Sequence, residues 1–247
     1  MVISHVIMRV PVVQGIIDRR ILINYQVEPD VLAKILPPPF EPKLINGVGI
    51  AGVCLIRLKY IRPRFIPAGL GITSENAAHR IAVQWRENAG YREGVYIPRR
   101  DTSSRLNTLV GGRLFPGIHH HAVFQVDEND DQFQIRLDSD DGETHLDIRA
   151  RLTGGLPETS VFQTLEEASD FFEAGSIGYS ATVQPDEYDG LELRSFNWRV
   201  EPLAVEKVGS SFFDNEALFP EGTIRFDNAL LMRGIEHEWY GKETLYC

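Results

Sequence analysis

The chain is poor in cysteine and has no long apolar run. Its 247 residues include two cysteines, Cys54 in an apolar stretch and Cys247 at the C-terminus, which excludes a disulfide framework. The longest nearly apolar run, residues 47–56, is about half of the roughly 20 residues that a membrane helix needs. Arg9 and Pro11 interrupt the apolar N-terminus without a cleavage site after them, so we predict no signal peptide. These absences predict a cytoplasmic protein with no membrane partner.

Charge is distributed unevenly along the sequence. The formal net charge is −10, but residues 127–143 alone carry eight acidic side chains and one arginine, or −7. Residues 57–113 reverse the balance, with eleven basic and four acidic side chains, or +7. The asymmetry fits an anionic ligand near the basic part, although most of its arginines, Arg80 among them, are interpreted as solvated strand faces. We expect no nucleic acid partner, because the chain is acidic and its basic residues are not interleaved with exposed aromatic ones.

Alternation of apolar and polar residues dominates the sequence. Three successive strands are predicted from HHAVFQV, QFQIRLD and THLDIRARL, with an Asp141-Gly142 turn between the last two. Phe133, Ile135 and Leu137 share one face, as do Leu146, Ile148, Ala150 and Leu152. Many short strands separated by turn residues favour a sandwich or a barrel.

Helices are expected in three places only. EPDVLAKILPP is bracketed by prolines, and a helix is predicted to begin after Asp101. TLEEASDFFEAG has a capping box, Thr164 with Glu167, and Gly175 as its stop. Prolines and glycines are spread throughout, without a linker or a repeat, so residues 1–247 are predicted to form a single domain.

Three consecutive histidines, His119–His121, lie at the start of the strand predicted from HHAVFQV, which contains the last two of them. In an extended chain His120 shares a face with Ala122, Phe124 and Val126, which predicts that His120 points inward and its two neighbours outward. Because alternation keeps the three from converging on one ion, no metal site is expected. A hydrogen-bonded core histidine and a ligand-contacting histidine both stay open. A β-bulge between residues 118 and 122, which the adjacent Gly117 favours, would reverse the assignment.

Residues 94–126, GVYIPRRDTSSRLNTLVGGRLFPGIHHHAVFQV, resemble the central signature of the acetoacetate decarboxylase-like superfamily. A Gly-x-Tyr strand precedes a helix and then a Gly-Arg-x-x-x-Gly turn, formed here by Gly112, Arg113 and Gly117. The chain is also similar, over roughly residues 15–240, to an uncharacterised branch of that superfamily. The resemblance implies a mainly β (α+β) fold, a closed or nearly closed antiparallel β-barrel with a few peripheral helices.

The resemblance also implies positions for a site, but not the same chemistry. His120 and His121 fall where the decarboxylases carry two adjacent lysines, the first of which forms a Schiff base. The five lysines include none between residues 60 and 206, and an imidazole cannot form an imine, so imine chemistry is not expected. Only Lys59 is placed to replace the missing amine. Glu75 matches a pocket glutamate or is a surface carboxylate at a strand end.

Two functions remain open at this stage. The first is a lyase- or hydrolase-type enzyme in which His120 and Glu75 perform acid–base chemistry on a small carbonyl or carboxylate compound. The second is a non-catalytic protein that binds a small organic ligand in the same pocket. Arg113 is predicted to bind a carboxylate through its planar fork, or to tie a helix end to a strand, and His121 is predicted to contact the ligand. No cofactor is expected, and a homo-oligomer stays open.

Overall fold

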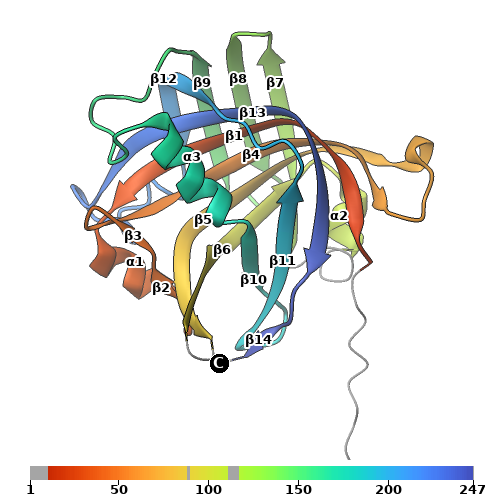
Figure 1. Ribbon diagram of the computed structural model, residues 1–247, viewed down its shortest axis with the longest axis horizontal. Coiled ribbons are helices and arrows are strands. Elements are labelled where there is room, and N and C mark those ends of the chain that lie inside the picture. Colours follow the sequence, from red (N-terminus) through yellow and green to blue (C-terminus); the bar gives the residue numbers. More distant parts are fainter. Residues whose placement is uncertain (1–10, 88–89, 111–116, 247) are drawn as a thin grey trace, which may run out of the picture.

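The structure is a computed structural model that describes residues 11–87, 90–110 and 117–246. It is mainly β, with one large mixed sheet (Figure 1). Its strands are β1 (Val13–Val27), β2 (Glu41–Pro42), β3 (Leu44–Ile45), β4 (Val48–Pro63), β5 (Ile72–Glu87), β6 (Gly90–Thr102), β7 (His119–Glu128), β8 (Gln132–Ser139), β9 (His145–Leu152), β10 (Ile177–Ala181), β11 (Glu187–Ser195), β12 (Glu201–Ser210), β13 (Ile224–Gly241) and β14 (Leu245–Tyr246). The helices are α1 (Pro29–Ile35), α2 (Arg105–Val110) and α3 (Leu165–Ala174), with a 3₁₀ turn at Ala68–Leu70.

The hydrogen bonds between the strands of the sheet close two rings. A first ring passes through β5, β6, β7, β8, β9, β12, β13, β1 and β4 and returns to β5. A second ring leaves at β6, passes through β10 and β11, and rejoins at β13. Strands β6, β5, β4, β1 and β13 therefore belong to both rings, and we call them the shared wall. The predicted mainly β, nearly closed barrel is confirmed, with two short parallel pairings, β6–β7 and β6–β10, in an otherwise antiparallel sheet.

The shared wall is covered on both faces. Seven successive residues of β1, from Ile21 to Val27, are buried, because alternate side chains enter cores on opposite sides. Ile21, Ile23, Val53, Leu55 and Ile81 join the core of the first ring. Leu22, Ile50, Cys54 and Ala82 lie on the other face and pack against α3. The wall thus separates a packed apolar core from a second compartment.

The outer strands and α3 follow the pattern of the sequence closely. The predicted inward faces of β8 and β9 are buried in the first ring, because one side of each strand faces water. In α3, Thr164 Oγ1 accepts the amide of Glu167, and Ala168, Phe171 and Phe172 are buried against the shared wall. Within the described residues no helix has the length and apolar character needed to span a bilayer. The single-domain division stays a prediction.

Candidate functional site

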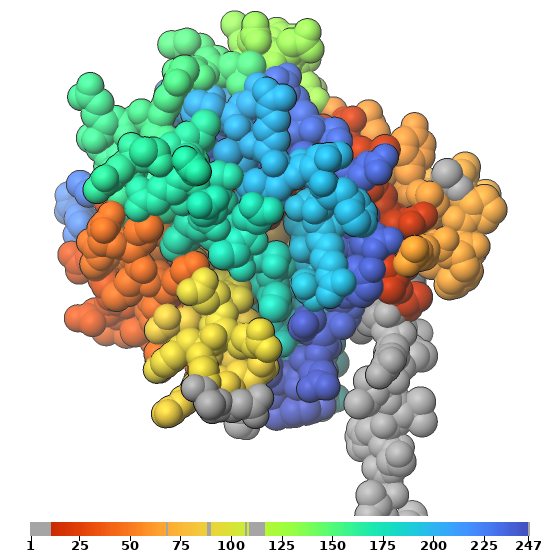
Figure 2. All heavy atoms as spheres, in the orientation of Figure 1, coloured from red at the N-terminus to blue at the C-terminus, as the bar shows by residue number. Residues whose placement is uncertain are grey.

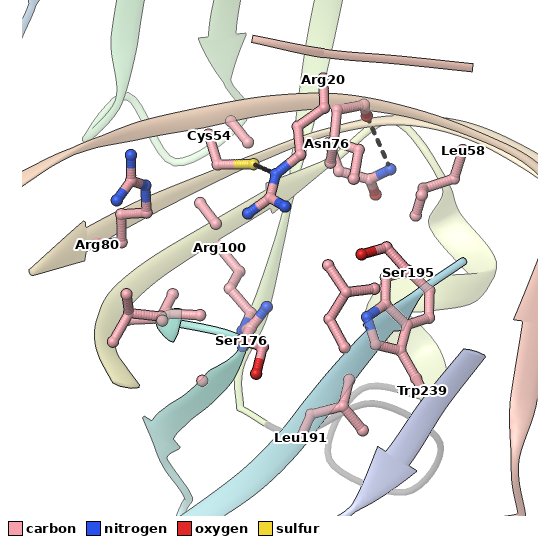
Figure 3. A pocket seen from close by; sticks show the side chains of 18 of the residues that line it. Arg20, Cys54, Leu58, Asn76, Arg80, Arg100, Ser176, Leu191, Ser195 and Trp239 are labelled. Carbon is pink, nitrogen blue, oxygen red and sulfur yellow. Dashed lines mark hydrogen bonds between the residues drawn. The ribbon is translucent and has the colours of Figure 1, made fainter. Parts of the chain in front are cut away.

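A cavity of about 370 Å³ lies on the second-ring side of the shared wall. Strands β10 and β11 close it from the other side (Figure 3). Phe172 and Glu173 at the end of α3 also line it. On the face shown in Figure 2, side chains of the α3 segment and of β11 lie next to each other over this region. Much of the lining is apolar: Ile56, Leu58, Ile61, Ile72, Val95, Ile97, Phe172, Leu191, Leu193, Trp198 and Trp239. The polar side chains that interrupt this surface define what the cavity can bind.

Three arginines from three strands of the shared wall reach this cavity. Arg20 comes from β1, Arg80 from β5 and Arg100 from β6, all from the wall face opposite the first-ring core (Figure 3). Within the described part of the chain, none of the three forms an ion pair with a carboxylate. Their positive charges are therefore not neutralised by the protein around them. Arg80 is buried and Arg20 and Arg100 are half-buried, and an arginine withdrawn from water is usually paired, which makes this arrangement unusual.

Neutral groups hold the three guanidinium groups instead. Arg20 donates its Nε–H to Cys54 Sγ at 3.2 Å (Figure 3). Arg80 donates to Asn24 Oδ1 and lies over the ring of Phe172, 4.8 Å from its centre. Arg100 donates its Nε–H to Ser180 Oγ at 3.0 Å. Arg20 Nη1 also lies 4.0 Å from Met232 Sδ. Within the described residues these contacts leave most of the fifteen N–H donors of the three guanidinium groups without a protein acceptor.

Arg80 and Arg100 keep their charge although burial lowers their pKa values. Burial lowers the pKa of Arg80 to about 10, and the charge of nearby Arg20 acts in the same direction. Burial likewise lowers the pKa of Arg100 to about 10. Both values lie well above neutrality, so both side chains stay protonated at pH 7.

The acidic residues of the lining do not offset this charge. Asp101 is bound to Arg99 at 2.7 Å, and Glu192 to Arg194 at 3.2 Å. Glu173 is exposed on α3. The interior of the cavity is therefore cationic and suits an anion with an apolar body.

His119 also lines the cavity, beside Arg100 in the parallel register of β6 and β7. Its Nδ1 lies 3.2 Å from the carbonyl oxygen of Gly117. Burial, together with the charge of Arg100, lowers the pKa of His119 to about 4. The imidazole is therefore neutral at pH 7, the form that can accept a proton.

His120 and His121 do not line this cavity, and the prediction that His120 is buried inside while His119 points outward is wrong. The His120 side chain is 35% exposed, against 21% for His121, and its Nδ1 lies 2.8 Å from Asp141. His121 Nδ1 lies 2.8 Å from Asp140. Parity is kept, but β7 begins at His119, so His120 sits at the open end of the first ring. The cavity lies on the opposite face, which His119 reaches.

Glu75 is held elsewhere, in an ion cluster with Arg19, Arg57 and Glu128. Arg19 is 3% exposed and binds both carboxylates, and Glu75 is not part of the cavity lining. The sequence predicted that Glu75 and His120 share one cavity. The structure does not bring the two side chains together in one. Their chemical roles stay untested predictions.

Arg113, with Gly112, lies outside the described residues. None of the five lysines is among the cavity residues in the described part of the chain, and Lys59 forms an ion pair with Asp18 at 2.8 Å. The described side chains also contain no group of three or more potential metal ligands.

Sequence reasoning missed the arginines, because an arginine that alternates with apolar residues reads as a solvated side chain. Arg80 is instead 4% exposed, and Ala82 on the same face is also buried. A small residue at that position was the available signal that the face is covered. What covers it, α3 together with β10 and β11, lies about 80 residues or more away in sequence.

Comparisons with known proteins support the fold. Residues 17–219 match the model of DUF2071, described as an uncharacterized conserved protein. Acetoacetate decarboxylase from Legionella pneumophila is similar in structure, with a TM-score of 0.58, 14% identity, and coverage of 93% of this chain and 86% of that chain. The enduracididine biosynthesis enzyme MppR complexed with pyruvate has a TM-score of 0.57, 11% identity, and coverage of 97% and 93%.

An acetoacetate decarboxylase-like enzyme from Sphingomonas wittichii has a TM-score of 0.57, 11% identity, and coverage of 96% and 93%. No curated protein matches the sequence. At these identities the similarity establishes an acetoacetate decarboxylase-like fold and leaves the chemistry to the residues of the cavity.

Proposed function

This chain belongs to the DUF2071 family of uncharacterized conserved proteins, and we propose that it binds a small organic carboxylate in the cavity of its second ring. One observation carries the proposal: three arginines that have no carboxylate partner among the described residues line one largely apolar cavity. Such a site fits a ligand with an apolar body and one or more carboxylate groups. Guanidinium groups recognise carboxylates through paired N–H donors, and a water-poor cavity strengthens these bonds.

The size of the cavity supports a small ligand. A volume of about 370 Å³ lies at the lower end of the range typical of ligand pockets, roughly 300–1,000 Å³. The aromatic rings of Phe172, Trp198 and Trp239 offer flat apolar surface for the body of the ligand. The carboxylate would lie against Arg20, Arg80 and Arg100, since each keeps N–H donors that bind no acceptor in the described part of the chain.

Calorimetric titration tests the proposal with pyruvate, butyrate and succinate, and with the matching uncharged amides. Pyruvate is included because it is the ligand named in one of the similar structures. We expect the acids to bind and the amides to bind far more weakly. Removing one guanidinium by Arg100→Met should weaken binding roughly 10- to 100-fold, because hydrogen bonds to charged groups contribute about 1.5–3 kcal/mol.

Arg149→Met is the matched control, because Arg149 is exposed on β9 and outside the cavity. Equal affinity for an acid and its amide would refute the proposal. So would an equal loss of affinity in the Arg100→Met and Arg149→Met proteins.

His119 favours a second candidate, an acid–base enzyme acting on the same anion. Its neutral imidazole, beside Arg100, places a proton acceptor next to the proposed carboxylate site. Such an enzyme should exchange the methyl protons of pyruvate with deuterium in D₂O, and His119→Gln should abolish the exchange. Binding of pyruvate without deuterium exchange would exclude this enzymatic role and support only the binding function.

A further inference from the structure

Behind Arg80, a chain of buried polar side chains crosses the shared wall. Arg80 Nη2 donates to Asn24 Oδ1 on β1, and Asn24 Nδ2 donates to Asn228 Oδ1 on β13 at 2.8 Å. Asn228 Nδ2 then donates to Asp227 Oδ2. Asn24, Asn228 and Asp227 are all completely buried. The chain thus joins a cavity cation to a carboxylate on the last strand of the wall through two neutral amides.

Asp227 is surrounded by donors, so both of its carboxylate oxygens act as acceptors. Its Oδ1 accepts the backbone N–H of Val161 at 2.7 Å and the Nε2 of Gln26. Its Oδ2 accepts the hydroxyl of Ser160 at 2.9 Å, in addition to Asn228. A backbone amide can only donate, and Gln26 must turn its Nε2 toward Asp227 because Arg225 occupies its Oε1.

Hydrogen-bond direction is therefore transmitted along the whole chain. An asparagine amide has one donor end and one acceptor end. Since Asp227 only accepts, Asn228 must present Nδ2 to it and Oδ1 to Asn24. Asn24 must then present Nδ2 to Asn228, which leaves its Oδ1 for Arg80, a side chain that can only donate.

From this geometry we infer that Asp227 is a positioning residue of the anion site. It sets the orientation of Asn228 and Asn24, and Asn24 in turn holds the Arg80 guanidinium against the cavity. The inference rests on the proposed function, because it assigns Arg80 to ligand binding.

Two further features agree with a positioning role. Ser160 and Val161, which bind Asp227, lie in the segment that leads into α3. That helix supplies Phe172, which covers the other side of the Arg80 guanidinium. Among the described residues, Arg80 has no carboxylate within ion-pair distance and Asp227 has no cation. The two amides therefore keep the carboxyl group of Asp227 away from the guanidinium group of Arg80.

Asp227→Asn tests this direction with almost no change of shape. Val161 and Gln26 both donate to Oδ1, so the new amide must keep its oxygen there and place its NH₂ against Asn228 Nδ2. Turning Asn228 moves the clash of donors to Asn24, and turning Asn24 moves it to Arg80. We expect Asp227→Asn to weaken pyruvate binding by about 10-fold or more, the effect of misplacing one charged donor.

The double exchange Asp227→Asn with Asn228→Asp is the matched control, because it has the same composition and charge as the wild type. The carboxylate that it places at position 228 accepts from the new amide at position 227 on one side and from Asn24 on the other. The Oδ1 of Asn24 is then free again for Arg80, and the Ser160 hydroxyl rotates to accept. We expect the double exchange to return pyruvate affinity to within about three-fold of wild type. Asp227→Asn alone should lower the urea midpoint of unfolding, and the double exchange should raise it again.

Removing Arg80 distinguishes a positioning role of Asp227 from a general effect of Asp227 on stability. In an Arg80→Met background, Asp227→Asn should cause no further loss of pyruvate affinity, because the residue that it positions is gone. The same fractional loss in both backgrounds would overturn the inference. So would a folded double-exchange protein that binds pyruvate 10-fold more weakly than wild type, a result that decides even where the single variant does not fold.

The two measurements distinguish a failure of the proposed function from a failure of the hydrogen-bonded chain. If wild type binds no pyruvate, the site is not an anion site and the positioning role falls with it. The recovery of the urea midpoint by the double exchange would then still establish the directed chain. A midpoint that does not recover would refute the chain itself, whatever the protein binds.

Discussion

His79 should make the protein lose stability as the pH falls below 6.5. The side chain is completely buried on β5, and its ring lies 4.8 Å from the ring of Phe212 and 5.7 Å from that of Phe213. Its Nδ1 has no hydrogen-bond partner among the described residues. Burial, together with the charge of Arg99, lowers the pKa of His79 to about 3. The folded protein therefore holds this imidazole neutral.

The sign and size of the effect follow from proton linkage. In the unfolded chain a histidine has a pKa of about 6.5, so below that pH the unfolded state takes up a proton that the folded state refuses. The contribution is fully present above pH 6.5 and is lost as the pH falls toward the folded pKa. Near pH 5.5 about 0.9 proton is taken up, which gives a slope of about 1.2 kcal/mol per pH unit. Between pH 7 and pH 5 the loss is about 2 kcal/mol.

Urea unfolding of wild type and His79→Leu at several pH values between 7 and 5 measures this slope directly. The variant should lose the His79 share of the slope, whatever its stability at pH 7. His119 and His237, whose pKa values burial lowers to about 4, contribute equally to both proteins and cancel in the difference. His145→Gln is the control, because that side chain is 61% exposed. Equal slopes in wild type and His79→Leu would refute the reasoning.

Four further outcomes are expected. In a Cys247→Ser protein, Cys54 should react with iodoacetate in preference to iodoacetamide more strongly when folded than in urea, because the cavity is cationic. Mass spectrometry of timed samples measures the ratio of the two alkylation rates. An equal ratio in the folded and unfolded protein contradicts the charge assignment. Thr164→Ala removes the cap of α3 and should lower the free energy of unfolding by about 1 kcal/mol in urea, with Thr164→Ser close to wild type. Ile135→Ala, at a fully buried position of β8, should lower it by about 2–5 kcal/mol in the same assay. Borohydride with acetoacetate or pyruvate should leave the intact mass unchanged, and an adduct mapped to Lys59 would overturn the expectation of no imine chemistry.

Local pattern was sufficient for the outer strands and for the ends of α3. Strands β8 and β9 alternate because one face of each meets water, so the sequence reveals which side chains enter the core. Thr164 and Gly175 bound α3 through contacts that span only a few residues. These features depend on neighbours in the chain, and the sequence contains all of them.

The residue pattern of the central strands reveals less about which side chains face the core of the first ring. From Ile21 to Val27 of β1 both faces are buried, so no alternation distinguishes the first-ring core from the cavity. The depth of His120 was misjudged for a related reason. Parity assigns a side chain to one face of a sheet, but its burial depends on which elements cover that face and on where the strand begins.

By itself, the sequence therefore determined the class of fold, the faces of the outer strands and the position of α3, because short-range periodicity and capping are physical consequences of adjacent residues. Only the tertiary structure decided that Arg20, Arg80 and Arg100 share one cavity and that His119 lines it in place of His120. It also decided that Asp227 stands behind Arg80. These groups lie on strands up to about 200 residues apart, and a charge is costly or useful according to what the fold places around it.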